Sequence, residues 1–205
     1  MFMKRVIEEV VRENAPGPSP SFTIYDAVRF LSIIASEGLV GRARLSEMLG
    51  LGEGATRTLI LKMVNKGLIS TSKKGCKLTE KGEKIWRSLK AHIPVMVELK
   101  EKNELTLARY NVAVLVRGGA NVRKGLEQRD ASIRAGAKGA STIVVKHGRL
   151  ILPAVSDDVS RDFPKAFTHI IQSLNPEEGD VVIICSADSL RDAERGSIAA
   201  AWTII

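Results

Sequence analysis

The sequence predicts an α+β protein of two domains, and three observations lead to this class. Residues 42–78 carry apolar residues at helical spacing and then two short β-prone runs around a basic turn. Beyond residue 93, apolar runs of strand length alternate with amphipathic stretches, which is typical of helices packed on a sheet. The chain has 205 residues, enough for two domains of about 100 each, and its basic excess lies almost entirely in the first of them.

The N-terminal segment, residues 1–20, predicts one helix followed by a linker. Residues 2–14 are amphipathic, and the run of alternating prolines at 15–20 cannot continue a helix. An isolated helix with an apolar stripe needs a cover, either its own domain or the same helix of a second subunit. The residues of this stripe are Val6, Ile7, Val10 and Val11.

The next domain, residues 21–92, opens with a helix capped by Thr23 and centres on two further helices joined by a glycine turn. The second of these, residues 53–66, has two different faces on a helical wheel. One face should pack inward and holds Ala55, Thr56, Leu59, Ile60 and Met63. The other should face solvent and holds Gly54, Arg57, Thr58, Leu61 and Asn65.

The outer face suits a helix laid in the major groove of DNA. Arg57 has the donors to bind a guanine, Thr58 can hydrogen-bond a base or a phosphate, and Leu61 can contact a thymine methyl. A hairpin over residues 68–78 should follow, with a basic tip that holds phosphates. We expect the phosphate contacts to come from Lys62, Lys73, Lys74 and Lys77.

Charge placement supports this expectation. Residues 52–92 hold 10 Lys+Arg against 3 Asp+Glu, whereas residues 93–205 hold 15 against 14. A basic patch on the elements that would face a groove attracts polyanions through phosphate contacts and counterion release. A solvated basic face without a partner is the alternative.

The order LGLGEGATRTLILKMVNKGLI, a basic turn and KLTEKG resembles the winged helix-turn-helix superfamily over residues 23–92. The resemblance implies a DNA-binding domain. Because proteins of that superfamily commonly bind two half-sites as dimers, it also implies a homodimeric transcriptional regulator that binds double-stranded DNA. Because winged helices also serve as protein-binding modules, a protein-interaction adaptor remains an alternative.

The third segment, residues 93–205, predicts a two-layer α/β sandwich with an antiparallel sheet. Its expected strands cover residues 95–99, 105–110, 112–117, 139–146, 149–153 and 180–185. Its expected helices cover residues 121–135, 163–174 and 189–202. We interpret this domain as one for dimerisation or effector sensing.

Two runs in this domain, GAKGASTIVV and GDVVIICSADSLRDAERGSIAAAWTI, resemble the GAD domain. That domain is an insert in bacterial-type aspartyl-tRNA synthetases and in a tRNA-dependent amidotransferase subunit, and the resemblance implies a fold more than an activity. It makes an RNA- or tRNA-associated binding protein a second alternative. The two halves together are similar to a family of archaeal proteins that join a winged helix to such a C-terminal domain.

Sites for small molecules are less clearly indicated. Strand ends and helix starts in the C-terminal domain favour testing Arg129, Asp130, Ser186 and Asp188 for an effector, although helix capping and solvation explain these residues more simply. The turn that begins at Gly118 could hold an anion, but a tight turn is the simpler interpretation. Cysteines and histidines show no ligand spacing, so we expect no metal, cofactor or catalysis. We also expect a cytoplasmic protein that does not enter a membrane.

Overall fold

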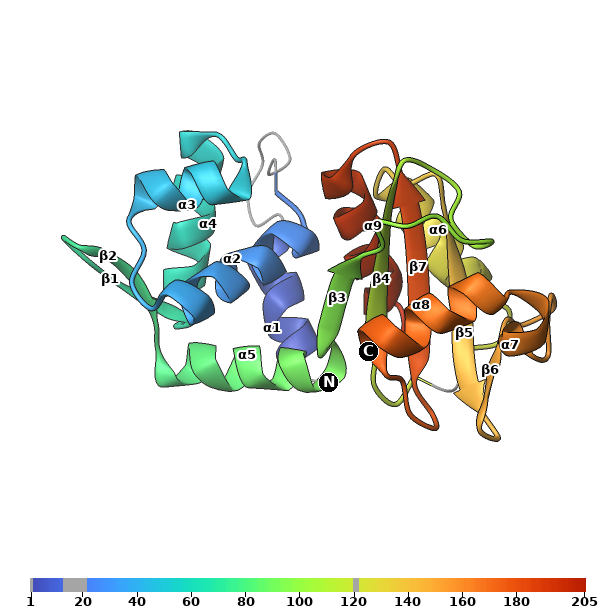
Figure 1. Ribbon diagram of the computed structural model, residues 1–205. Helices are drawn as coiled ribbons and strands as arrows, with labels where there is room; N and C mark the ends of the chain where they lie inside the picture. The colour runs from blue at the N-terminus through green and yellow to red at the C-terminus, as the bar shows by residue number, and fades with distance from the viewer. Residues whose placement is uncertain (1, 13–21, 120–121) are drawn as a thin grey trace. The chain divides into compact units, whose positions relative to one another are not determined.

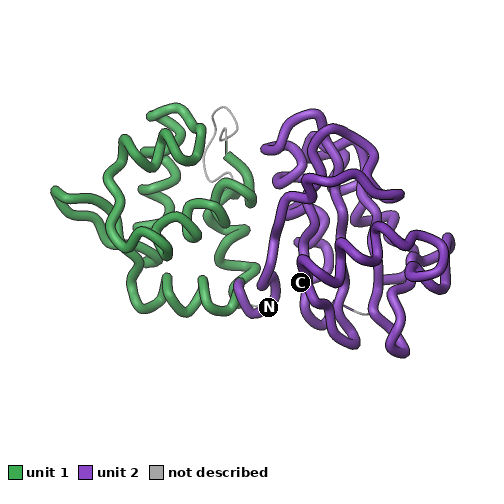
Figure 2. Tube along the Cα trace, viewed as in Figure 1, with its two compact units in different colours: residues 1–89 green, residues 90–205 purple. Residues whose placement is uncertain are grey.

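The computed structural model describes residues 2–12, 22–119 and 122–205. The chain forms two compact units, residues 1–89 and 90–205 (Figures 1 and 2). The linker predicted at residues 15–20 lies outside the described residues. Both units combine helices with antiparallel strands, so the chain is a mixed α+β protein. Among the described residues, no helix combines the length and the apolar character needed to cross a membrane.

Unit 1 is a group of helices from which one hairpin projects (Figure 1). The hairpin strands pair antiparallel, with Ile69 opposite Leu78. Val40 forms an isolated β-bridge to Cys76, which lies on the same strand as Leu78. The fully buried side chains of Phe30, Leu45 and Leu59 lie in the core of the unit. The elements are α1 (Phe2–Val11), α2 (Ile24–Glu37), α3 (Arg42–Leu49), α4 (Glu53–Asn65), β1 (Ile69–Ser72), β2 (Gly75–Leu78) and α5 (Glu80–His92).

The first helix, α1, is covered by its own unit. Of the predicted stripe, Val6, Ile7 and Val10 are buried and Val11 is half-buried; Met3 is buried with them, and α1 contacts both α2 and α4. An ion pair of 2.8 Å between Lys66 and Glu9 adds a polar contact beside this packing. Of the two covers that the sequence left open for this stripe, the structure therefore has the intramolecular one.

Unit 2 is a five-stranded antiparallel sheet in the order β3-β4-β7-β5-β6 with helices packed against it. The two longest-range pairings place β7 in the centre, between β4 and β5. The elements are β3 (Val95–Glu98), β4 (Tyr110–Val116), α6 (Leu126–Arg134), β5 (Gly139–Lys146), β6 (Arg149–Ile151), α7 (Val159–Asp162), α8 (Pro164–Leu174), β7 (Val181–Ala187) and α9 (Leu190–Trp202).

The prediction of a two-layer sandwich was wrong, because helices cover both faces of this sheet. Alternate residues of β4 and β7, such as Leu115 and Ile184, pack with Ile170 of α8 on one face. On the other face Cys185 packs with Ala193 of α9, and α6 contacts β5. All residues of β7 are buried, as are all but the first of β4, and a strand buried on both sides needs a helix on each. Unit 2 therefore has three layers.

The prediction of a strand at residues 105–110 was also wrong for residues 105–109, because β4 begins at Tyr110. Hydrogen bonds with side chains replace strand pairing in and next to this segment. The Glu104 carboxylate accepts hydrogen bonds from the backbone N–H groups of Lys165 and Ala166 at the start of α8. The backbone N–H of Leu107 donates to Ser186 Oγ at 3.0 Å. The segment is thus a loop that holds α8 in place.

The helix predicted at residues 121–135 begins later, at Leu126. Gly125 precedes it with φ of 72°, a left-handed conformation that interrupts a helix and that glycine adopts at little cost. The short helix α7 was not predicted, and it is one turn long, too short for a periodic pattern to be recognised.

A close backbone contact in unit 1 gives a stability prediction. A Cβ at Gly82 in α5 would lie 2.0 Å from the carbonyl oxygen of Leu68, so Gly82→Ala should force α5 away from the base of the hairpin. We expect a loss of about 1–3 kcal/mol in the free energy of unfolding, measured by urea denaturation followed by circular dichroism.

The matched control for this variant is Gly54→Ala in α4, where a Cβ would meet nothing within 4 Å. Alanine is the better helix former, so this variant should be as stable as the unchanged protein or gain about 0.5–1 kcal/mol. Equal stability of the two variants would contradict the role given to the close contact.

Candidate nucleic-acid interface

Helix α4 presents one face to the interior of unit 1 and one to solvent. Thr56, Leu59 and Met63 are buried, whereas Arg57, Thr58 and Leu61 are exposed, with Leu61 58% accessible. These positions agree with the helical wheel. Sequence reasoning missed Val64, which is 36% exposed and lies seven residues after Arg57, two helical turns along the same side. The exposed face of α4 is therefore partly apolar.

The turn before α4 sets where this face begins. Gly50 ends α3 in the left-handed conformation with φ of 60°, and Ser46 Oγ donates to the carbonyl oxygen of Leu51 at 2.6 Å. Gly52 occupies the position before the first turn of α4, and no side chain caps this helix start. The first N–H groups of α4 are thus left without a capping side chain beside the exposed residues of its N-terminal half, and they give that end a partial positive charge.

Lys62, predicted as a phosphate contact, points elsewhere. Its Nζ donates to the backbone carbonyl oxygen of Arg12 at 2.5 Å and lies 5.7 Å from the centroid of the Phe22 ring. Lys66 on the same helix pairs with Glu9 of α1, and this ion pair lowers the pKa of the Glu9 carboxyl. Both lysines therefore belong to the contact between α4 and α1, and Lys62 is not part of the exposed face.

The hairpin projects its basic tip from a constrained base. Gly75 has φ of 142°, and a Cβ there would come within 2.5 Å of the Val40 carbonyl oxygen, so only glycine fits. Cys76 exchanges two backbone hydrogen bonds with Val40, of 2.8 and 3.0 Å. Burial of Cys76 raises the pKa of its thiol. The hairpin lysines, Lys73, Lys74 and Lys77, are all exposed.

Several cations of this region are not held in ion pairs. None of the ion pairs between described residues involves Arg57 or the three hairpin lysines. The same holds for Lys84 and Arg87, two exposed cations of α5 that were not singled out from the sequence. The local charge excess of residues 52–92 was the signal that could have identified them. The surface keeps its positive charge available for an external polyanion.

The four residues proposed from the sequence for an effector have separate partners in unit 2. Arg129 and Asp130 pair with each other at 3.0 Å on α6. Asp188 pairs with Lys138 at 2.8 Å. Ser186 is fully buried, and its hydroxyl donates to Asn111 Oδ1 at 2.6 Å while it accepts from the Leu107 N–H. In the part of the chain that the structure describes, no hydrogen bond or ion pair joins Arg129 or Asp130 to Ser186 or Asp188. No group of three or more acidic, histidine or cysteine side chains in that part is placed to hold a metal ion.

In a comparison with known protein families, one family model matches residues in each unit. The model described as "PH0730-like, N-terminal domain" matches residues 24–84. The model described as "Domain of unknown function (DUF4443)" matches residues 107–204. The protein therefore belongs to the α+β class, with an antiparallel sheet in each of its two units, and it is similar to archaeal-type proteins.

A solved structure extends the similarity over nearly the whole chain. The chain is similar to "Hypothetical protein PH0730 from Pyrococcus horikoshii OT3", with 27% sequence identity and a TM-score of 0.68. The alignment covers 90% of this chain and 93% of that one. A comparison with curated proteins found no match.

Proposed function

We propose that the protein is a sequence-specific DNA-binding regulator of transcription, in which unit 1 acts as a winged helix-turn-helix domain. In this proposal α4 lies in the major groove and the hairpin tip contacts the phosphate backbone. The observation that carries it is the coincidence of unpaired cations with these two elements. Arg57 lies on the exposed side of α4, and Lys73 and Lys74 form the tip of the hairpin that follows α4 directly.

The two groups of residues would do different work. Arg57 presents a planar fork of donors that matches the two acceptors of guanine, and Leu61 offers an apolar surface to a thymine methyl. Thr58 Oγ1 donates to the Gly54 carbonyl oxygen at 3.0 Å, which leaves its lone pairs for a donor on a base. Phosphate contacts by the hairpin lysines would give affinity and register without reading sequence.

The exposed apolar residues favour a second candidate, a protein-interaction adaptor. Leu61 and Val64 lie one turn apart on α4 and give its outer side an apolar strip that a partner protein could cover. An adaptor of this kind would show no salt-dependent affinity for nucleic acid. An RNA- or tRNA-binding protein, the other alternative, would prefer tRNA to duplex DNA at matched salt. The resemblance of unit 2 to the GAD domain remains a prediction, and the DNA-binding proposal does not depend on it.

Selection of bound duplexes from a random pool tests the proposal. A DNA-binding regulator should enrich one sequence motif, and its affinity for the enriched duplex should fall steeply as salt is raised. Competition with tRNA at the same ionic strength belongs in the same experiment. A pool that yields no enriched motif, or a clear preference for tRNA, would reject the assignment.

Arg57→Ala tests base reading. Loss of a bidentate contact to guanine should cost about 1–3 kcal/mol of binding to the selected duplex and relax the preference at one base pair. Affinity is measured by fluorescence anisotropy on the selected duplex and on single-base variants of it. If the discrimination between these duplexes were unchanged, Arg57 would not read a base.

The double variant Lys73→Ala, Lys74→Ala tests phosphate contact. It should weaken binding to selected and unrelated duplexes alike and reduce the slope of log affinity against log salt by up to about 2, roughly one for each lysine. The matched control is Lys62→Met, which removes a cation that the structure places against α1 and keeps an apolar side chain over Phe22. This control should leave the slope unchanged. An equal fall in slope for Lys62→Met would show that its ammonium contacts DNA after all.

Homodimerisation is the remaining part of the proposal. The apolar stripe of α1 is covered within unit 1, so it no longer supports a dimer. The support that remains is the geometry of two half-sites one helical turn apart, which a symmetric pair of recognition helices would match. Light scattering should give the mass of two chains in the presence of the selected duplex. A monomeric mass on a palindromic duplex would remove this part.

A further inference from the structure

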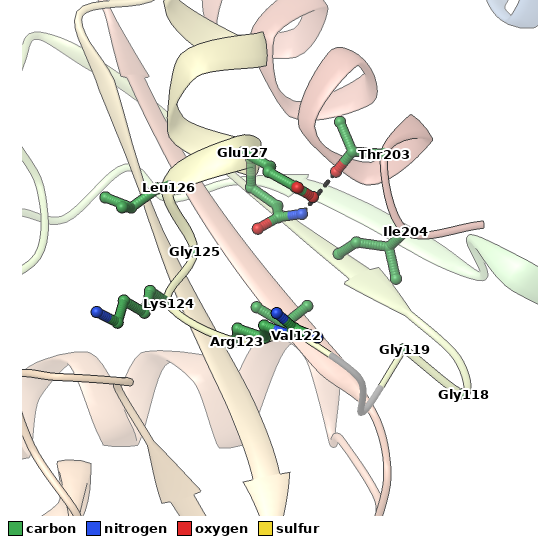
Figure 3. Close-up of a pocket in the computed structure, with 11 residues that line it drawn as sticks. Gly118, Gly119, Val122, Arg123, Lys124, Gly125, Leu126, Glu127, Thr203 and Ile204 are labelled. Atoms are coloured by element: carbon green, nitrogen blue, oxygen red, sulfur yellow. Dashed lines mark hydrogen bonds between the residues drawn. The ribbon is translucent and has the colours of Figure 1, made fainter.

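A cavity of about 530 Å³ lies in unit 2, where the start of α6 meets the chain end that follows α9 (Figure 3). Its walls include the segment just before α6, and Thr203 and Ile204 lie across from it. A volume of this size is in the range that takes a small organic molecule. The cavity is formed by residues of unit 2, whereas α4 and the hairpin belong to unit 1.

Positive charge gathers at one side of this cavity. Arg123 and Lys124 line it, both are exposed, and neither takes part in an ion pair between described residues. The nine-residue helix α6 starts beside them after Gly125, with no side chain capping its first turn. The partial positive charge of that helix start and the two side-chain cations together favour an anion.

A buried polar side chain forms part of the inner wall. Gln128 lines the cavity although it is only 4% exposed, and its amide nitrogen donates to Thr203 Oγ1 at 2.7 Å. This hydrogen bond joins the first turn of α6 to the segment that follows α9, so the two sides of the cavity are held together.

The rest of the lining is mixed in a way that fits an organic phosphate better than a bare ion. Val122, Leu126 and Ile204 provide apolar walls. Glu127, the one acidic residue of the lining, supplies a carboxylate that can accept hydrogen bonds from hydroxyl groups but would repel a second anionic group. The cavity thus offers separate surfaces to a phosphate, to hydroxyls and to a ring.

We propose that this cavity binds a small phosphorylated organic molecule of the size of a nucleoside monophosphate. Its phosphate lies between Arg123, Lys124 and the first N–H groups of α6. Its sugar hydroxyls face Glu127 and Gln128, and its apolar part lies on Leu126 and Ile204. The site is independent of the DNA-binding proposal, because it lies wholly in unit 2 and its ligand is a small molecule.

Isothermal titration calorimetry of the full-length protein tests this site with four probes: adenosine 5′-monophosphate, ribose 5-phosphate, adenosine and inorganic phosphate. At least one of the two organic phosphates should bind about tenfold or more tightly than both adenosine and inorganic phosphate, because only these probes fill the charged and the uncharged surfaces together. Failure of both organic phosphates to bind would overturn the proposal, as would equal binding of inorganic phosphate.

Variants place the binding in this cavity. The double variant Arg123→Ala, Lys124→Ala should weaken the organic phosphate about tenfold or more. The matched control is Lys146→Ala with Arg149→Ala, which removes two exposed cations of the same unit on the β5–β6 hairpin, outside the cavity. Thermal melting of each variant confirms that unit 2 is folded. Unchanged affinity in the Arg123, Lys124 variant, or an equal loss in the control, would reject the cavity as the site.

Discussion

The junction at Leu68 holds the proposed recognition helix, the hairpin and α5 in one arrangement. The backbone N–H of Leu68 donates to Met63 at the end of α4, and its carbonyl oxygen accepts from Thr79 just before α5. Thr79 Oγ1 donates to the Gly67 carbonyl oxygen at 2.6 Å and accepts from Gly82 at 3.1 Å. Because Gly82 has no side chain, α5 can lie directly against the carbonyl oxygen of Leu68. The base of the hairpin is thereby held to the end of α4 and to the start of α5 by backbone hydrogen bonds and by the Thr79 hydroxyl.

Much of unit 1 follows from local patterns in the sequence. The helix at residues 53–66 and the hairpin at residues 68–78 were predicted within about a residue, because glycine stops and apolar spacing act over a few positions. The inner and outer faces of α4 were predicted for the same reason. The direction of Lys62 was not, since it depends on Arg12 and Phe22, which reach α4 only through tertiary packing. A helical wheel assigns a face to a residue and does not show which other helix is near it.

Unit 2 shows where local reasoning ends. Most of its strands were predicted, but the number of layers was not, although the sequence held a usable signal. The runs VAVLV and VVIIC are apolar without alternation, as expected of strands covered on both sides. The segment from Leu105 to Arg109 was predicted as a strand, because the hydrogen bond that the Leu107 N–H donates to Ser186 comes from far along the chain and is not visible in a local pattern. The cavity near α6 likewise joins chain segments about 80 residues apart.

The short outer strand β6 has a consequence for how unit 2 behaves among other copies of itself. It spans three residues, is paired with β5 alone among the described strands, and turns away at a bridge between Leu152 and Ser156. Its first residue, Arg149, is exposed beside Lys146 on β5. A β-strand of a neighbouring molecule that approached this edge of the sheet would meet few free backbone N–H and C=O groups and two positive charges. The border thus disfavours edge-to-edge growth of the sheet into fibres.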